Sequence, residues 1–226
     1  MGVLDGRTAI ISGAGTGLGR AAAISFAQQG ANIVLLGRRQ NKLDETAAII
    51  EEQQGLGRVL ALQTDVAVPQ EIDYAVETAV RTFGQVDILI NNAASFEPGQ
   101  VIELTIEEWT RQIATNLTGP FLLTKAVLPV MRRARYGRIV NITSGLAWNG
   151  AGGYAAYSAS KAGLESLTRT TADEENDYGI LANSFNPGTL RTEMHATGKD
   201  PLVVTPHLIR LASLPQDGET GTLVNY

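Results

Sequence analysis

Residues 8–19 read Thr-Ala-Ile-Ile-Ser-Gly-Ala-Gly-Thr-Gly-Leu-Gly, and this stretch decides the fold. Its first part, Thr8 to Ser12, is a nearly continuous apolar run, which is typical of a strand buried on both faces of a sheet. Four glycines follow within seven residues, and a helical pattern then runs from Leu18 to Gln29. A strand, a glycine-rich turn and a helix in this order predict the start of a βαβ unit.

The glycine turn predicts a nucleotide site. Gly13, Gly17 and Gly19 are spaced as Gly-x-x-x-Gly-x-Gly, which differs from the more general Gly-x-Gly-x-x-Gly pattern. Glycine allows a tight turn and lets the backbone approach a pyrophosphate, whose charge is favoured at a helix N-terminus. The alternative is a glycine turn that binds nothing, but four glycines exceed what the turn requires.

Strand-like and helical patterns alternate through the rest of the chain. This alternation implies right-handed crossovers and a parallel sheet. We therefore predict an α/β fold with a doubly wound, mostly parallel sheet of about seven strands, helices on both faces, and one domain spanning residues 1–226. Further strands are expected at 32–36, 58–63, 86–90, 138–142, 180–185 and 222–226, and helices at 41–54, 69–83, 106–131 (with a possible break at Gly119-Pro120), 157–177 and 207–213.

Composition excludes several classes of function. The 226 residues include no Cys and two His, and no cluster has metal-ligand spacing, so no metal site is expected. The net charge of −5 and the scattered basic residues argue against nucleic-acid binding. No apolar run approaches the ~20 residues of a membrane span. Asp5 and Arg7 leave no room for a signal peptide, so we expect a cytoplasmic protein without membrane partners.

Tyr157 and Lys161 are the most informative pair of side chains. Positions i and i+4 share one helix face, so the phenol and the ammonium are predicted to face one site. A nearby positive charge lowers a phenol pKa, which prepares it for proton transfer to a carbonyl or from an alcohol. The alternative is a surface pair that only shares a face. Tyr154 lacks such a partner because Ser158 lies four residues beyond it.

The end of the second strand predicts the cofactor. An acidic residue there would favour NAD by binding the adenosine ribose. This chain has Arg38 and Arg39 instead, and a guanidinium suits a phosphate, so NADP(H) is favoured and NAD(H) remains possible. The alternative is two solvated arginines at a helix start. Asp65, followed by Val66, either contacts the adenine or is a turn aspartate.

Together these motifs resemble the short-chain dehydrogenase/reductase superfamily in its single-domain form. The resemblance covers nearly the whole chain and is specific because the motifs occur in the family's order. They are the glycine turn from Ser12 to Gly19, Asp65-Val66, Asn91-Asn92-Ala93-Ala94, Asn116, Ser144, Tyr157, Lys161, and Asn186-Pro187-Gly188 with Thr192.

The resemblance implies a role for each matching residue. Tyr157 would exchange a proton with the substrate oxygen, and Lys161 would lower the phenol pKa and hold the nicotinamide ribose. Ser144 would hydrogen-bond the substrate oxygen, and Asn116 would anchor a water leading from Lys161 to solvent. These four are the expected catalytic residues. Expected cofactor contacts are Gly13, Gly15, Thr16, Gly17, Leu18, Gly19, Arg38, Arg39, Asp65, Val66, Asn92, Ala93, Ala94, Ile142, Tyr157, Lys161, Pro187, Gly188, Leu190 and Thr192.

The chain departs from the family pattern in three places. Ser12 replaces a usual Thr, Ala94 stands where Gly is commoner, and the segment from Glu193 to Thr205 is short for a substrate-covering loop. The usual Asp-Gly-Gly ending is also missing before Tyr226. The short segment indicates an open site, a site for bulky substrates, or reduced activity.

The substrate is expected to be a neutral small molecule with a carbonyl or alcohol group. Ser144 and Tyr157 would meet its oxygen, and Trp148 and Met194 are expected nearby, although core or interface packing is an equal alternative for both. The main hypothesis is an NADP-dependent oxidoreductase that interconverts a ketone or aldehyde and an alcohol. The alternative is an NADP-binding sensor or scaffold without turnover. The resemblance also implies a homodimer or homotetramer. The other candidate pocket residues are Ala94, Ser95, Phe96 and Tyr154.

Overall fold

The computed structural model describes residues 2–53, 57–193 and 195–226. Within these residues, seven strands form one sheet in the order β3-β2-β1-β4-β5-β6-β7, and every pairing is parallel. This confirms the predicted doubly wound α/β fold. The strands are β1 (Thr8–Ser12), β2 (Asn32–Gly37), β3 (Val59–Gln63), β4 (Ile88–Asn91), β5 (Gly137–Ile142), β6 (Ile180–Asn186) and β7 (Leu223–Asn225).

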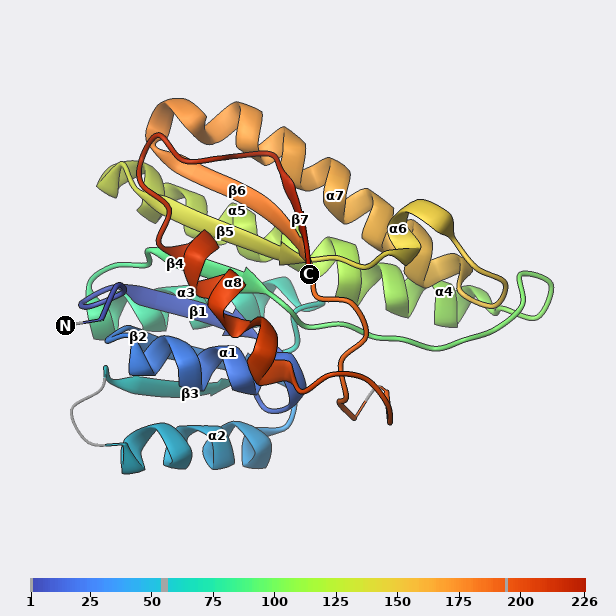
Figure 1. Cartoon of the computed structure of the whole chain (residues 1–226), viewed down its shortest axis with the longest axis horizontal. Helices are drawn as coiled ribbons and strands as arrows, with labels where there is room; N and C mark the ends of the chain where they lie inside the picture. The colour runs from blue at the N-terminus through green and yellow to red at the C-terminus, as the bar shows by residue number, and fades with distance from the viewer. Residues whose placement is uncertain (1, 54–56, 194) are drawn as a thin grey trace.

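Helices cover both faces of the sheet (Figure 1). On one face, apolar side chains of α1, α2 and α8 pack on alternate strand residues such as Ile11 and Ile33. On the other face, α3, α5 and α7 pack on the intervening residues, such as Ile10 and Val34. Successive residues of a strand point to opposite faces, so this division explains the continuous apolar runs. The helices are α1 (Gly17–Gln28), α2 (Gln40–Glu52), α3 (Pro69–Phe83), α4 (Ile106–Ile113), α5 (Gly119–Ala134), α6 (Leu146–Asn149), α7 (Ala155–Glu175) and α8 (Thr205–Ala212).

The segment predicted as a helix over 106–131 is continuous and contains a π turn. Thr105 caps α4 together with Glu108 in a capping box. The π-helical segment η1 (Ala114–Thr118) then leads directly into α5. Pro120 has no N–H to donate to the carbonyl of Asn116, four residues earlier, so the α-helical ladder is interrupted at this point. Gly119-Pro120 therefore widens the helix and does not break it.

Three short helical segments were not expected. The short helix α6 and the 3₁₀ segments η2 (Asn176–Tyr178) and η3 (Pro201–Val204) were not predicted, because a single turn carries too little periodicity. The expected end of the second helix, at Gln54, lies outside the described residues, and α2 is described to Glu52. None of the described helices is long and apolar enough to cross a membrane.

The two ends of the strands carry different kinds of residues: structural contacts lie at one end, and the candidate site residues lie at the other. At the start of β5, the side chain of Arg138 is buried and donates to the carbonyls of Leu214 and Gly179 at 2.9 and 3.0 Å. It thereby ties the connection after α8 and the start of β6 to β5. The opposite end, where the strands finish, carries the glycine turn and the residues singled out by the sequence. In parallel sheets of this kind, ligands bind at that carboxyl end.

Candidate active site

The glycine turn joins β1 to α1 at the carboxyl end of the sheet. Gly13 and Gly17 have φ angles of +67° and +53°, which L side chains rarely adopt. A Cβ on Gly19 would lie 2.2 Å from the carbonyl oxygen of Gly13, so α1 can approach the turn only with glycine there. Asn92 donates to the carbonyls of Ser12 and Gly13 at 3.0 and 3.3 Å and braces the turn from the end of β4. The turn is thus held in a shape that leaves its backbone open to a ligand.

Tyr157 and Ser144 meet at the end of β5. Tyr157 lies in the first turn of α7, and Ser144 follows β5 by two residues. The two hydroxyls are hydrogen-bonded, and this bond acts to lower the pKa of Tyr157. Burial acts more strongly in the opposite direction, so the pKa of Tyr157 is raised above its ordinary value of 10. The phenol is therefore protonated throughout the neutral range.

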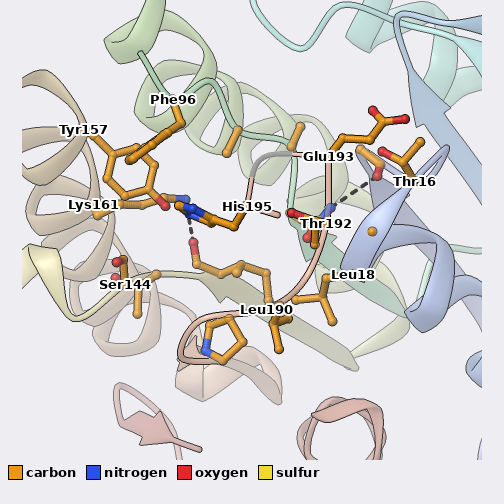
Figure 2. A pocket seen from close by; sticks show the side chains of 18 of the residues that line it. Thr16, Leu18, Phe96, Ser144, Tyr157, Lys161, Leu190, Thr192, Glu193 and His195 are labelled. Atoms are coloured by element: carbon orange, nitrogen blue, oxygen red, sulfur yellow. Dashed lines mark hydrogen bonds between the residues drawn. The ribbon is translucent and has the colours of Figure 1, made fainter. Parts of the chain in front are cut away.

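Lys161 shares the inner face of α7 with Tyr157, as Figure 2 shows. Its ammonium donates to the carbonyl oxygen of Ile142 at 2.7 Å and lies 5.6 Å from the centroid of the Tyr157 ring. Burial lowers the pKa of Lys161 to about 8. The sequence predicted that Lys161 would lower the phenol pKa, but the pKa of Tyr157 is raised because burial outweighs the hydrogen bond with Ser144.

Asn116 lies in the π turn and is completely buried. Its amide nitrogen donates to the carbonyl of Ser95 at 2.9 Å and to the hydroxyl of Ser160 at 3.1 Å. Its amide oxygen accepts from the Ser95 backbone at 2.7 Å, and Ser160 donates to the carbonyl of Tyr157 at 2.7 Å. Asn116 therefore ties the loop after β4 to the first turns of α7, where Tyr157 is placed.

Aromatic rings line the side of the site next to Tyr157. Phe96 packs edge-on against Tyr157 with a centroid distance of 4.9 Å and stacks on Tyr154 at 5.3 Å. The ring of His195, from the segment after β6, contacts the same Phe96 at 5.1 Å. The rings come from three separate segments of the chain and together form an apolar wall.

The glycine turn and the tyrosine face each other across one cleft of about 1030 Å³. This volume lies at the upper end of small-molecule sites and is large enough for a dinucleotide together with a small substrate. Besides the residues already described, the cleft is lined at its nucleotide end by Gly37, Arg38, Arg39, Lys42, Leu43 and Glu193, and elsewhere by Gly145, Leu146, Asn186 and Thr189.

The model of the short chain dehydrogenase family matches residues 7–201, which include both the glycine turn and the tyrosine. The chain belongs to this family. As a short-chain dehydrogenase it is an oxidoreductase, and its relatives carry the names of dehydrogenases and reductases.

Relatives of this chain are named for different substrates. The chain is 36% identical over 194 residues to a 3-oxoacyl-[acyl-carrier-protein] reductase of Synechocystis sp., covering 86% of this chain and 78% of that protein. It is 39% identical over 197 residues to a trans-4-hydroxycyclohexanecarboxylate dehydrogenase of Sinomonas cyclohexanicum, covering 84% and 74%. A crystal structure of a short chain dehydrogenase from Mycobacterium smegmatis superposes with a TM-score of 0.91 at 31% identity, covering 100% of this chain and 93% of that one.

The structure of this short-chain dehydrogenase brings most of the predicted site residues together. The predicted catalytic residues Ser144, Tyr157 and Lys161 line the cleft. The predicted cofactor residues that line it are Gly13, Gly15, Thr16, Gly17, Leu18, Arg38, Arg39, Asn92, Ala93, Ala94, Ile142, Pro187, Gly188, Leu190 and Thr192.

Six predicted residues lie elsewhere. The backbone of Ser95 exchanges hydrogen bonds with the buried side chain of Asn116. Asp65 accepts from the backbone of Ala67 at 2.9 Å, which is the turn alternative, and Val66 is buried in the core beside α3. Gly19 and Asn116 lie behind the cleft wall in the packing contacts described above. Trp148, on α6, is 74% exposed, and its indole donates to Glu165 at 3.0 Å, so the prediction that it lines the substrate pocket is corrected. Met194 lies outside the described residues.

Several cleft residues of this short-chain dehydrogenase were not predicted, and three of them have ionisable side chains. His195, Glu193 and Lys42 all line the cleft. Lys42 is a helix residue one turn beyond the arginines, and a pattern of basic residues from Arg38 onward offered a weak signal for it. Glu193 and His195 lie in an irregular loop, where the sequence carries no periodicity that indicates which side chains face inward.

Proposed function

We propose that the protein is an NADPH-dependent reductase of a neutral ketone or aldehyde, with Tyr157 as the proton donor. The observation that carries the proposal is the buried, protonated phenol, which is hydrogen-bonded to Ser144 and lies beside the Lys161 ammonium. This group faces a glycine turn in the same cleft. The relatives named as reductases and dehydrogenases support the same reaction class.

The residues at the glycine end of the cleft fit a phosphorylated dinucleotide. The turn leaves backbone N–H groups at the N-terminus of α1, and side chains on Gly13 and Gly17 would both strain the turn and narrow it. Arg38, Arg39 and Lys42 place positive charge at the end of β2, where a 2′-phosphate binds in this fold class. When bound, NADPH supplies the hydride.

The proton is delivered by the protein. Ser144 holds the substrate oxygen within reach of the phenol, and Tyr157 donates its proton to that oxygen as the carbonyl carbon is reduced. Because burial raises the pKa of Tyr157, the phenol carries its proton at neutral pH, which favours reduction. Lys161 stabilises the negative charge that develops on the phenol oxygen as the proton leaves.

The substrate side is apolar and aromatic. Phe96, Tyr154 and His195 surround the tyrosine and offer no guanidinium or ammonium for an anionic group. We therefore propose a substrate whose part near the reacting carbon is uncharged. A panel read as loss of NADPH absorbance, including a 3-oxoacyl thioester, a cyclic diketone and simple aldehydes, tests the proposal. Clear NADPH binding with no turnover of any compound would favour the sensor alternative.

We also propose that the protein self-associates through α5 and α7. A groove between these helices combines apolar side chains, including Phe121, Leu128 and Leu167, with charged residues such as Lys125 and Glu174. Phe121 is nearly half exposed there, which is costly for a surface that faces only water. Light scattering of the purified protein distinguishes a homodimer or homotetramer from a monomer.

The rate of reduction is expected to fall as the pH rises through about 8. The Lys161 pKa of about 8 means that its ammonium is present below this pH and is lost above it. Without that charge the phenolate left after proton transfer is less stable, so kcat/KM should fall about tenfold per pH unit above this point. Initial rates measured from about pH 6 to 10 check it. A profile that is flat up to pH ~9.5 would contradict the role of Lys161.

Arg38→Gln is expected to weaken NADPH binding about tenfold or more, since a hydrogen bond to a charged group contributes about 1.5–3 kcal/mol. NADH lacks the 2′-phosphate, so its affinity should change little. Fluorescence titration of both nucleotides measures the effect. Arg81→Gln, at an exposed position on α3, is the matched control. Equal losses for NADPH and NADH would rule out recognition of the phosphate by Arg38.

A further inference from the structure

An ion pair crosses the nucleotide end of the cleft. Arg39, at the start of α2, donates to the carboxylate of Glu193 at 2.7 Å and to the hydroxyl of Thr16 at 3.4 Å. Arg39 belongs to the wall after β2, Thr16 to the glycine turn and Glu193 to the segment after β6. Figure 2 shows Glu193 and Thr16 on the same side of the cleft, away from Tyr157.

The segment that carries Glu193 lies against the glycine turn. A Cβ on Gly17 would come within 3.0 Å of the Thr192 methyl group, so the two backbones are in close approach. The backbone N–H of Thr192 donates to the carbonyl of His195 at 2.9 Å, which closes a tight turn around position 193. The carboxylate of Glu193 is therefore placed by its own loop and faces Arg39 across the cleft.

Arg38 and Arg39 differ in whether an acidic side chain pairs with them. Glu45 accepts from Arg20 and Lys42 at 2.8 and 2.7 Å. Glu193 accepts from Arg39, and within the described residues Arg38 makes no ion pair. The guanidinium of Arg39, together with Lys42 and Arg20, holds the pKa of Glu193 below its ordinary value, so the carboxylate is ionised at neutral pH. Among the described residues, the positive charge of Arg38 at the mouth of the cleft therefore has no acidic partner.

We propose that Glu193 determines how strongly this site prefers the phosphorylated cofactor. A 2′-phosphate must displace the carboxylate to reach Arg39, and it is repelled by the carboxylate while the ion pair stays closed. The ribose 2′-hydroxyl of NADH is uncharged, so the carboxylate of Glu193 does not repel it and accepts a hydrogen bond from it. The inference rests on the proposed function and deepens it, since it assigns the cofactor selectivity to a residue of the loop after β6.

Glu193→Gln tests the inference in the full-length protein. Both partners are exposed, 54% for Arg39 and 56% for Glu193, so the substitution leaves the fold intact and the pair itself is weak. An exposed pair contributes up to about 1 kcal/mol, so NADPH affinity should rise about twofold to fivefold while NADH affinity stays constant or falls. The gain should disappear at high ionic strength, because screening removes exposed charge interactions.

A double-mutant cycle separates an effect through Arg39 from other effects. NADPH and NADH are titrated by fluorescence against the wild type, Glu193→Gln, Arg39→Gln and the double variant. We expect no further gain from Glu193→Gln once Arg39 is removed. Glu219→Gln is the control because Glu219 also forms a surface ion pair, with Arg210 on α8, and neither residue lines the cleft. It should leave both affinities unchanged.

Three results would overturn the inference. An unchanged ratio of NADPH to NADH affinity in Glu193→Gln shows that the carboxylate has no part in selectivity. An undiminished gain in the Arg39→Gln background shows that the effect does not pass through this pair. Wild-type protein that binds neither nucleotide overturns the proposed function itself, and this result differs from a wild type that prefers NADPH while Glu193→Gln changes nothing.

Discussion

Tyr157→Phe is expected to reduce turnover by about 10²–10⁴-fold while NADPH binding stays within about twofold of the wild type. The substitution removes one oxygen and keeps the ring that packs on Phe96. The substrate carbonyl then has no proton donor when the carbon is reduced, and Ser144 is left without its hydroxyl partner. Steady-state rates with NADPH, together with fluorescence titration of the nucleotide, measure the two effects separately.

The control for this prediction is Tyr74→Phe. Tyr74 is exposed on α3, so the same chemical change should leave the rate as it is. A Tyr157→Phe protein that turns over at the wild-type rate would show that the proton comes from another group. A protein that loses nucleotide binding and turnover together would show that the phenol holds the cleft in shape.

Gly19→Ala is expected to destabilise the protein by about 1–3 kcal/mol and to abolish tight nucleotide binding. Alanine ordinarily stabilises a helix relative to glycine by up to about 1 kcal/mol. Here the new Cβ would lie 2.2 Å from the carbonyl oxygen of Gly13 and 2.7 Å from the amide nitrogen of Asn92. The clash is with the backbone, so α1 must move away from the turn. This movement separates the backbone groups that would bind a pyrophosphate.

Urea unfolding and NADPH titration check this second prediction. Gly152→Ala is the matched control because a Cβ at Gly152 meets no atom within 4 Å and the backbone needs no left-handed conformation. Its stability should stay within about 0.5 kcal/mol of the wild type. If Gly19→Ala is as stable as the wild type and binds NADPH equally well, close packing of the turn on α1 is not required.

The fold could be predicted because the inner strands, β2, β1, β4, β5 and β6, are buried on both faces. Residues 9–11 and 33–36 are apolar throughout, and such runs need no knowledge of their neighbours to be identified. Strand ends shifted by one or two residues, as at Ile88 in β4, because pairing with β1 and β5 fixes them. Pro120 was ambiguous in sequence, since its effect depends on whether the preceding turn can widen.

The candidate site was predictable where the chemistry lies within one motif. Tyr157 and Lys161 share a helix face by spacing alone, and the glycine turn is local. Residues that reach the cleft from irregular loops, such as His195 and Glu193, were missed because only tertiary contacts place them. Trp148 was misplaced because α6 turns its indole to Glu165, a residue 17 positions later in the chain.

The buried Arg138 lies at the end of the sheet opposite the cleft, and its contacts there involve no residue of the site. The framework that secures the fold and the loops that choose the ligand are thus spatially separate. Laboratory evolution of new selectivity can concentrate on cleft residues that lie outside the core, such as Leu146, Glu193 and His195, with little risk to the scaffold that carries them.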